Sequence, residues 1–197
     1  MPRISGVSVR EGGLGTRIAY FFTRRDMSRI TGRAPERMLE PVEVYAHIPG
    51  LLRAYGRLEQ ATGSLRQMDQ RYMALAAMKT ATLVTCEYCI DLGSQISRRL
   101  GLTDAELLDL PRYKDSPLFD ETDRIVIDYA VGMTRTPAEV PDELFVELAD
   151  RFTDSQIVEL THLIAMENMR GRFGIGLDIG AAGFSEGMVC AIPIKPE

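Results

Sequence analysis

Tryptophan is missing from this sequence of 197 residues, and its cysteines and histidines number only three and two. A zinc site needs four such ligands at close spacing, but His47, His162 and Cys190 stand apart from one another. No run approaches the roughly 18 apolar residues of a membrane span, and Met1–Leu14 lacks the apolar segment of a signal peptide. We therefore expect a cytoplasmic protein that has no membrane span and binds no metal or other cofactor.

Positive charge is concentrated in the first 33 residues, which hold seven arginines and two acidic residues. This segment has a net charge of +5, which leaves −10 for the remainder of a chain whose total is −5. An acidic chain is not expected to bind nucleic acid as a general partner. We predict a basic arm or helix over residues 1–35, with Ile18–Ile30 helical. It is either a solvated helix docked by Phe21, Phe22 and Met27 or an arm that contacts an acidic surface, a membrane face or a neighbouring subunit.

Alternating strand patterns are also missing, apart from a short one at Val189–Ile194. Residues 36–197 are predicted to form a single domain, and their apolar spacing is helical almost throughout. Capping pairs and proline or glycine stops predict where the helices begin and end. Helices are expected at Leu51–Leu58, from the Ser64/Gln67 pair to Val84, from the cysteine pair to Gly101, from the Thr103/Glu106 pair to Leu110, from Asp120 to Thr136, from Pro141 with Leu144, Phe145 and Leu148 facing inward, and from the Thr153/Gln156 pair to Gly174 or Gly176. The sequence therefore predicts an all-α fold.

Two of the three cysteines, Cys86 and Cys89, form a C-x-x-C pair within the stretch T-C-E-Y-C-I-D. A spacing of three residues on one helical turn brings both sulfurs to one face and permits a disulfide. An apolar helical pattern ends near Val84 and a new one begins at the pair. We therefore expect the pair at a helix N-terminus, where unpaired N–H groups and the positive dipole end favour the thiolate.

Three interpretations of the pair are open. A zinc half-site lacks a second pair of ligands in this chain. A structural disulfide is possible, although a bridge across three residues closes too short a loop to stabilise the fold much. In a reducing cytosol a C-x-x-C pair is more often catalytic or metal-binding than structural. A redox or nucleophilic role is the favoured hypothesis.

Four polar residues interrupt the apolar pattern of the last predicted helix: Glu167, Asn168, Arg170 and Arg172. Helical spacing puts Asn168 and Arg172 on one face. They either line a pocket or form a buried or interfacial hydrogen-bond network, and the network is the favoured interpretation. His162 lies away from that face and His47 stands beside a Pro-Gly turn, so both are expected to make ordinary hydrogen bonds.

Five stretches of the sequence resemble one known family in their order and spacing: C-E-Y-C, R-R-L-G-L-T-D-A-E-L, S-P-L-F-D-E-T-D-R, Y-A-V-G-M-T-R-T-P and E-L-T-H-L-I-A-M-E-N-M-R-G-R-F. Over about Pro41–Leu177 the chain resembles the carboxymuconolactone decarboxylase and alkylhydroperoxidase D (AhpD) family. The resemblance implies an AhpD-like all-α helical bundle and a homo-oligomer with active sites near subunit contacts. In members with C-x-x-C it also implies thiol-dependent peroxidase or disulfide reductase activity.

The resemblance further implies a role for each sulfur. Cys89 corresponds to the peroxidatic thiol, which attacks a peroxide and becomes a sulfenic acid, and Cys86 to the resolving thiol, which closes the disulfide that a cellular dithiol reopens. Peroxidase members of the family also use a histidine four residues after the second cysteine and a glutamate twelve before the first. This chain has Gly93 and Ala74 there.

Without these relay residues, the helix terminus must provide most of the thiol activation. Glu87 and Asp91 are poor substitutes, because a carboxylate beside a thiol raises the thiol's pKa. We expect a thiol peroxidase or disulfide reductase that acts on a small peroxide or disulfide and is reduced by an unidentified dithiol. The alternatives are a redox-sensing or structural helical oligomer and, less well supported, a lyase of the decarboxylase type.

Overall fold

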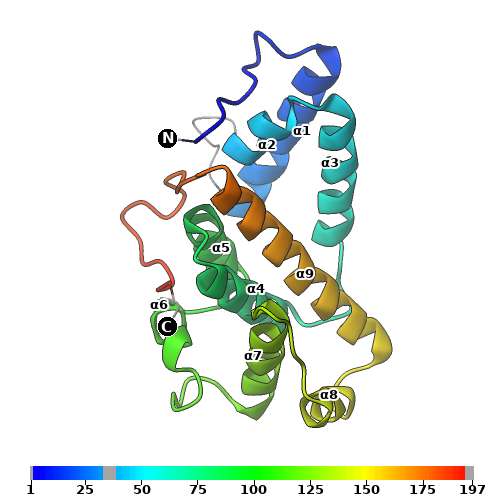
Figure 1. Cartoon of the computed structure of the whole chain (residues 1–197). Coiled ribbons are helices and arrows are strands. Elements are labelled where there is room, and N and C mark those ends of the chain that lie inside the picture. The colour runs from blue at the N-terminus through cyan, green and yellow to red at the C-terminus, as the bar shows by residue number, and fades with distance from the viewer. Residues whose placement is uncertain (1, 33–38, 194–197) are drawn as a thin grey trace.

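The computed structural model describes residues 2–32 and 39–193, and within these ranges it is all-α and contains no strand (Figure 1). The helices are α1 Leu14–Thr31, α2 Glu40–Tyr45, α3 Pro49–Gly63, α4 Gln70–Val84, α5 Glu87–Arg99, α6 Asp104–Asp109, a short 3-10 helix Leu110–Arg112, α7 Glu121–Thr134, α8 Asp142–Ala149 and α9 Asp154–Gly176. No helix in the described ranges is long and apolar enough to cross a membrane.

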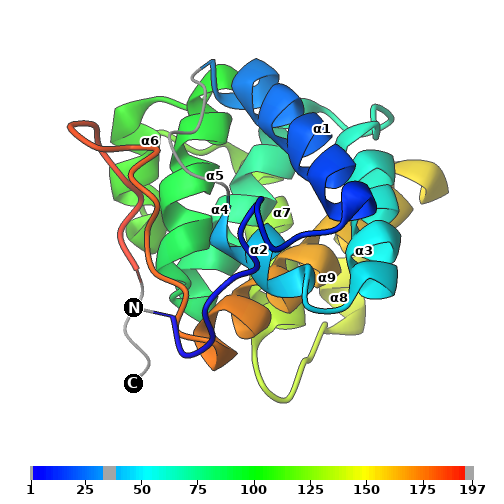
Figure 2. The same ribbon diagram turned by 90° about the horizontal axis from the view of Figure 1, so that it is seen from above.

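Helix α4 forms the centre of the bundle and packs against α5, α7 and α9. Its inward residues Leu75, Ala76 and Met78 are fully buried, as expected for a helix covered on several sides. In Figure 1, α1 to α3 lie together at one end of the molecule, and α7 and α8 lie at the other. Both views show the segment after α9 running back beside α5 (Figure 2). Helix α5 therefore lies between the bundle centre and the C-terminal segment.

Capping residues set most helix starts as predicted. Thr103, Asp120 and Thr153 each accept a hydrogen bond from the backbone three residues on, and each belongs to a complete capping box. The predicted start at Ser64 is wrong. That residue ends α3 and donates its hydroxyl hydrogen bond to a carbonyl of that helix, whereas Asp69 caps α4 by accepting from the backbone N–H of Arg71.

Three smaller expectations need correction. In α8, Leu148 is fully buried as predicted, but Phe145 is 44% exposed because it lies on the outer face of this short helix. In α1, Met27 docks the helix as expected, while Phe21 and Phe22 are 64% and 45% exposed. The strand pattern at 189–194 forms no strand up to residue 193, and residue 194 lies outside the described ranges. The division into segments 1–35 and 36–197 stays a prediction.

Candidate functional site

The cysteine pair lies where α4 ends and α5 begins, as the sequence predicts. Thr85 takes up the left-handed conformation, with φ of 60°, which stops α4 after Val84. Cys86 is the N-cap of α5, and its Sγ accepts a hydrogen bond of 3.2 Å from the backbone N–H of Cys89. The two sulfurs form a disulfide, with Cα atoms 5.2 Å apart. When the bridge opens, this N–H is already directed at the Cys86 sulfur and stabilises negative charge there.

The two sulfurs differ in how they are covered. Cys86 is 1% exposed, whereas Cys89 is 7% exposed. Cys86 packs against α9 at two glycines: a Cβ atom on Gly174 would lie 3.5 Å from the Cys86 sulfur, and one on Gly171 would lie 2.7 Å from a methyl of Val84. The glycines let α9 approach the pair closely. Cys86 is therefore the more deeply buried residue of the pair.

A C-terminal strap, residues 178–193, is fastened to α5 through one carboxylate. Buried Asp91 accepts hydrogen bonds from the backbone N–H groups of Ala182, Phe184 and Ser185, at 2.9, 3.0 and 2.6 Å. The hydroxyl of Ser185 also donates to the backbone carbonyl of Asp91, at 2.8 Å. Asp91 lies two residues along α5 from Cys89. The hydrogen bonds that its carboxylate accepts hold the strap against α5.

The strap supplies part of the apolar cover of the site. Ile179 and Phe184 belong to the same buried cluster as the cysteine pair, and Phe184 lies edge-on to the Tyr88 ring at 6.4 Å. Further along, the strap carbonyl of Val189 accepts from Arg98, and Cys190 packs against the cluster as a partly buried free thiol. The surroundings of Cys190 could not be inferred from the sequence, because the strap is brought to α5 by tertiary contacts.

The two relay positions face the packed side of α5. A Cβ atom on Gly93 would lie 2.7 Å from the sulfur of Met78 on α4. Met78 is fully buried and Ala74, one turn earlier, is 3% exposed. An apolar side chain thus occupies the space beside position 93, where a histidine would extend.

Tyr88, between the two cysteines, is a residue to which the sequence analysis assigned no role. Its side chain is 8% exposed, and its hydroxyl has no hydrogen-bond partner in the described part of the protein. Burial raises the pKa of this phenol, and the nearby negative charge of Asp91 and of Glu59 raises it further. Tyr88 is therefore a protonated donor beside the pair with its hydrogen unused.

Two of the four polar residues of α9, Glu167 and Arg170, form a partly buried ionic cluster, which agrees with the favoured interpretation for these two residues. Arg170 donates to Glu59 of α3 at 2.8 Å and to Glu167 at 2.9 Å. Burial raises the pKa of Glu167, while the Arg170 charge opposes that shift. Glu167, Arg170, Gly171 and Gly174 follow one stripe of α9, so the cluster lies on the face that meets Cys86. The sequence could not reveal Glu59, which is 111 residues from Arg170.

An aromatic stack borders this ionic cluster. Tyr45 lies between Tyr55 and Phe173, with both ring centroids 4.3 Å from its own. Burial raises the pKa of Tyr55, and Glu59 raises it further. The stack joins α2, α3 and α9.

The remaining polar candidate of α9 has a local role. Asn168 donates to Thr134 at 3.1 Å and accepts from Arg172, which confirms that these two α9 residues share a face.

The two histidines also have local roles. The ring of His47 makes a 2.8 Å hydrogen bond with the carbonyl of Ser5. The ring of His162 makes one of the same length with the hydroxyl of Thr62. Both histidines therefore make ordinary hydrogen bonds, as expected.

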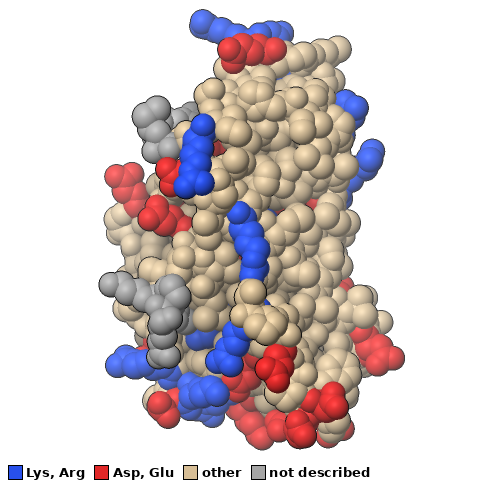
Figure 3. Space-filling view, in the orientation of Figure 1, with Lys and Arg blue, Asp and Glu red and all other residues tan. Residues whose placement is uncertain are grey.

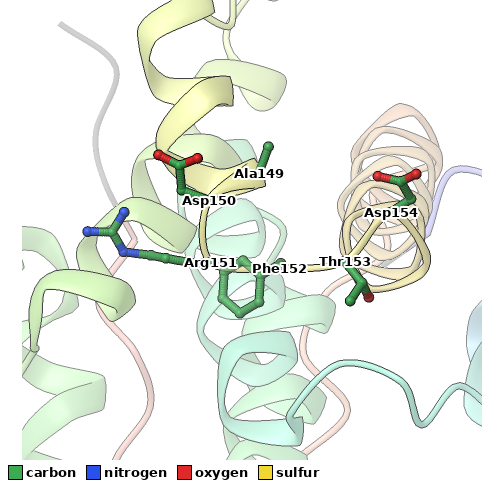
Figure 4. A pocket seen from close by; sticks show the side chains of 6 residues that line it. All are labelled: Ala149, Asp150, Arg151, Phe152, Thr153 and Asp154. Carbon is green, nitrogen blue, oxygen red and sulfur yellow. The ribbon is translucent and has the colours of Figure 1, made fainter.

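Two surface pockets lie away from the cysteines. One, of about 550 Å³, is at the turn between α8 and α9, and Figure 4 shows its side chains pointing in different directions and not converging on one point. The other, of about 390 Å³, lies beside α4 and α7. Neither is lined by Cys86 or Cys89.

Residues 49–124 match the sequence profile of the carboxymuconolactone decarboxylase family. The chain is 32% identical over 163 residues to the uncharacterized protein YnjA of Escherichia coli K12, a match that covers 80% of this chain and 85% of YnjA.

Two solved structures share the fold. The debrominase Bmp8, in its complex with 2,3,4-tribromopyrrole, gives a TM-score of 0.73 at 19% identity, over 91% of this chain and 92% of Bmp8. An uncharacterized peroxidase-related protein with an alkylhydroperoxidase AhpD core, from Ralstonia eutropha JMP134, gives 0.68 at 18% identity, with the same coverage of both chains.

Proposed function

The chain belongs to the carboxymuconolactone decarboxylase family, and on this premise we propose that it is a thiol-dependent oxidoreductase that reduces a small peroxide or disulfide through Cys89 and Cys86. One observation carries the proposal. Cys89, the less deeply buried residue of the pair, is bonded to a sulfur that already accepts a helix N-terminal N–H. Attack on Cys89 therefore expels a thiolate that the helix stabilises, and a better-stabilised thiolate leaves faster.

In the oxidising half of the cycle the Cys89 thiolate attacks one peroxide oxygen and breaks the O–O bond. The other oxygen leaves as an alkoxide or hydroxide and takes a proton, while Cys89 becomes a sulfenic acid. The Cys86 thiolate then attacks the Cys89 sulfur, which releases hydroxide and closes the disulfide. We assign protonation of the departing peroxide oxygen to the hydroxyl of Tyr88, which is adjacent to Cys89 in the chain and donates no hydrogen bond in the described ranges.

In the reducing half a thiolate of an external dithiol attacks Cys89, and Cys86 leaves as the thiolate. The second thiol of the reductant then resolves the mixed disulfide, so two electrons pass from the dithiol to the pair. The relay positions lack a base, so the chemistry relies on the α5 N-terminus. We expect modest peroxidase rates at neutral pH as a result.

Repeated cycling of the thiols tests the proposal. Peroxide is added to the purified protein with excess dithiothreitol, and both peroxide loss and free thiols are followed over many turnovers. Wild type should consume many equivalents and Cys89→Ser none, whereas Cys190→Ser should match wild type. A single oxidation without re-reduction would instead indicate a redox sensor or a structural disulfide.

Reductive dehalogenation is a second candidate, favoured by the aromatic rings of Tyr88, Phe184 and Phe173 in or against the apolar cluster that holds the cysteines, together with the fold shared with debrominase Bmp8. Here a carbon–bromine bond would be replaced by carbon–hydrogen, with two electrons from the cysteine pair and release of bromide. Bromide release from 2,3,4-tribromopyrrole, measured with dithiothreitol present, decides between the candidates. Release faster than peroxide consumption would favour the dehalogenase.

We also propose that the protein acts as a cytoplasmic homo-oligomer. The outer face of α1 supports assembly, because Leu14, Ile18 and Phe21 are 77%, 49% and 64% exposed. Light scattering should give a particle of at least twice the mass of one chain. A monomer at micromolar concentration would contradict this part of the proposal.

A further inference from the structure

A basic surface pocket lies beside α4 and α7, and neither Cys86 nor Cys89 lines it. It has a volume of about 390 Å³ and combines the end of α4, the segment after the 3-10 helix and the end of α7. Its lining is Lys79, Leu83, Pro111, Arg112, Tyr113, Lys114, Asp115, Val131 and Arg135. Four of these side chains are cationic and one is acidic, although the chain as a whole carries −5 and both kinds of charge occur on the face in Figure 3.

Lys79 is the unusual member of this basic pocket. It is only 3% exposed, and a buried ammonium normally has a carboxylate partner. Its Nζ instead donates to the carbonyl of Leu110 at 3.2 Å and lies 4.3 Å from the centroid of the Tyr113 ring. In the described ranges no carboxylate lies within ion-pair distance of Lys79. The ammonium has three hydrogens, so it retains a donor for an incoming acceptor.

The other cations divide into paired and unpaired ones. Arg112 is paired with Asp109 at 2.6 Å and Lys114 with Asp128 at 3.4 Å. Arg135 is exposed at the C-terminal end of α7 and forms no ion pair with the part of the chain that the structure describes. Lys79 of α4 and Arg135, the residue that caps the end of α7, thus supply two positive charges to one cavity. Neither forms an ion pair in the described ranges.

The charges facing Lys79 explain its electrostatic state. Burial lowers the pKa of Lys79 to about 8, Asp128 of α7 partly offsets this shift, and Lys114 adds to it. Tyr113 remains neutral, because burial and its hydrogen bond to Asp128 raise its pKa. A bound anion would supply the negative charge that Lys79 lacks.

From this geometry we infer that the basic pocket is a binding site for a small organic carboxylate, whose oxygens are received by Lys79 and Arg135. The walls define the rest of the ligand. Leu83, Pro111 and Val131 are apolar and the Tyr113 ring forms one side, so a hydrocarbon or aromatic body fits better than a bare inorganic ion. The site is separate from the cysteine pair, and nothing in the proposed redox cycle uses it.

Calorimetric titration of the full chain tests this inference with three probes. Benzoate has the charge and the flat apolar body, benzamide has the body without the charge, and inorganic phosphate has charge without the body. We expect benzoate to bind at millimolar concentration or below and at least tenfold more tightly than either of the others. Equal binding of benzamide, tighter binding of phosphate, or no benzoate binding at millimolar concentrations would each overturn the inference.

Two substitutions locate the site. Lys79→Met keeps side-chain length and should weaken benzoate at least tenfold, and the exposed change Arg135→Gln should weaken it about threefold or more. Arg151→Gln is the matched control. It removes one positive charge next to Glu121, at the opposite end of α7 from Arg135, and should leave affinity unchanged. If Arg151→Gln weakens benzoate as much as Arg135→Gln does, general charge and not this pocket is responsible.

The pH dependence gives a readout that a structural role for Lys79 would not produce. Benzoate affinity in wild type and Arg135→Gln should fall by at least threefold between pH 7 and pH 9.5, as Lys79 loses its proton. Lys79→Met should show no such fall, and a fall that persists in this variant would contradict the assignment.

Discussion

Two regions that border the same helix, α4, treat charge in opposite ways. At the C-terminal end of α4, the cysteine pair is enclosed by α9 and the strap. The charged groups near it have partners: Arg170 donates to two glutamates, and Asp91 accepts from three backbone N–H groups. Two turns earlier, the basic pocket is open and leaves Lys79 without a carboxylate. A satisfied charge fixes structure, whereas an unsatisfied one at a cavity remains available to a ligand. This difference distinguishes the proposed reaction site, which is covered, from the proposed binding site, which is open.

The largest expected effect comes from adding a general base beside the cysteine pair, where this chain has none at the two relay positions. A variant combining Ala74→Glu, Met78→Ala and Gly93→His makes room for an imidazole beside Cys89 and a carboxylate to orient it. Peroxide turnover at pH 7 should rise about a hundredfold, the low end of general base assistance. The gain should shrink as the pH rises toward about 8.5, the ordinary pKa of a free cysteine, because the thiol then loses its proton without help.

Met78→Ala alone controls for the cavity that the combined variant creates. Stopped-flow peroxide assays and alkylation of Cys89 across pH are the measurements. A folded combined variant with the rate and alkylation profile of Met78→Ala would show that another group sets the reactivity of Cys89.

In the basic pocket, the comparison predicts that Lys79 costs stability. The unfolded chain keeps Lys79 protonated up to its ordinary pKa of 10.5, but the folded pKa is about 8. The folded state thus binds fewer protons between these values, so the Lys79 contribution to stability rises with pH across this window. Lys79→Met should be more stable than wild type by about 2 kcal/mol at pH 7, with the gap closing toward pH 10. Urea denaturation at both pH values measures it, with the exposed α3 change Arg57→Gln as control. A gap that does not depend on pH would refute the account.

Releasing the strap should make the cysteine region resemble the open pocket. Asp91→Asn weakens the charge-assisted bonds to the strap and should cost about 1.5 kcal/mol. Hydrogen exchange should quicken at residues 182, 184 and 185, and Cys89 should alkylate several times faster. Glu143→Gln removes an exposed acid from α8, a helix that carries neither the cysteines nor a hydrogen bond to the strap, and should change neither. If Asp91→Asn leaves exchange at these amides unaltered, the strap is held by its apolar contacts.

The smallest effect concerns the proton donor. Tyr88→Phe should slow the peroxide step about threefold to fivefold, since water can also protonate the leaving oxygen. Disulfide exchange with dithiothreitol needs no such proton and should be unchanged. Tyr113→Phe, which removes a hydroxyl in the basic pocket, serves as control. Equal slowing of both half-reactions by Tyr88→Phe would point to a packing defect.

The fold and the position of the cysteine pair could be predicted because both depend on local signals. Apolar spacing identified the helices, and the break after Val84 placed Cys86 at a helix start. The error at Ser64 arose because the Ser64/Gln67 pair matches a capping box, whereas the cap that the structure uses is Asp69, five residues later. The local pattern does not contain the tertiary packing that sets where this helix begins.

The surroundings of the site depend on contacts between distant segments and could not be predicted. Asp91 was expected to oppose thiol activation as a nearby charge. Its carboxylate instead accepts hydrogen bonds from backbone N–H groups more than 90 residues away in the chain. Glu59 and Lys79 gave no signal, because each lies within an ordinary helical pattern. Only the fold shows that Glu59 meets Arg170 and that Lys79 lines a cavity.

The most direct test of the account is to map where one equivalent of peroxide reacts in the single-cysteine variants. Cys86→Ser should complete one turnover and hold a sulfenic acid on Cys89, which mass spectrometry detects after trapping with dimedone. Cys89→Ser should consume no peroxide and carry no oxidised Cys86. A sulfenic acid on Cys86 in Cys89→Ser, with Cys89 unmodified in Cys86→Ser, would contradict the assignment of Cys89 as the attacking sulfur and Cys86 as the helix-stabilised one.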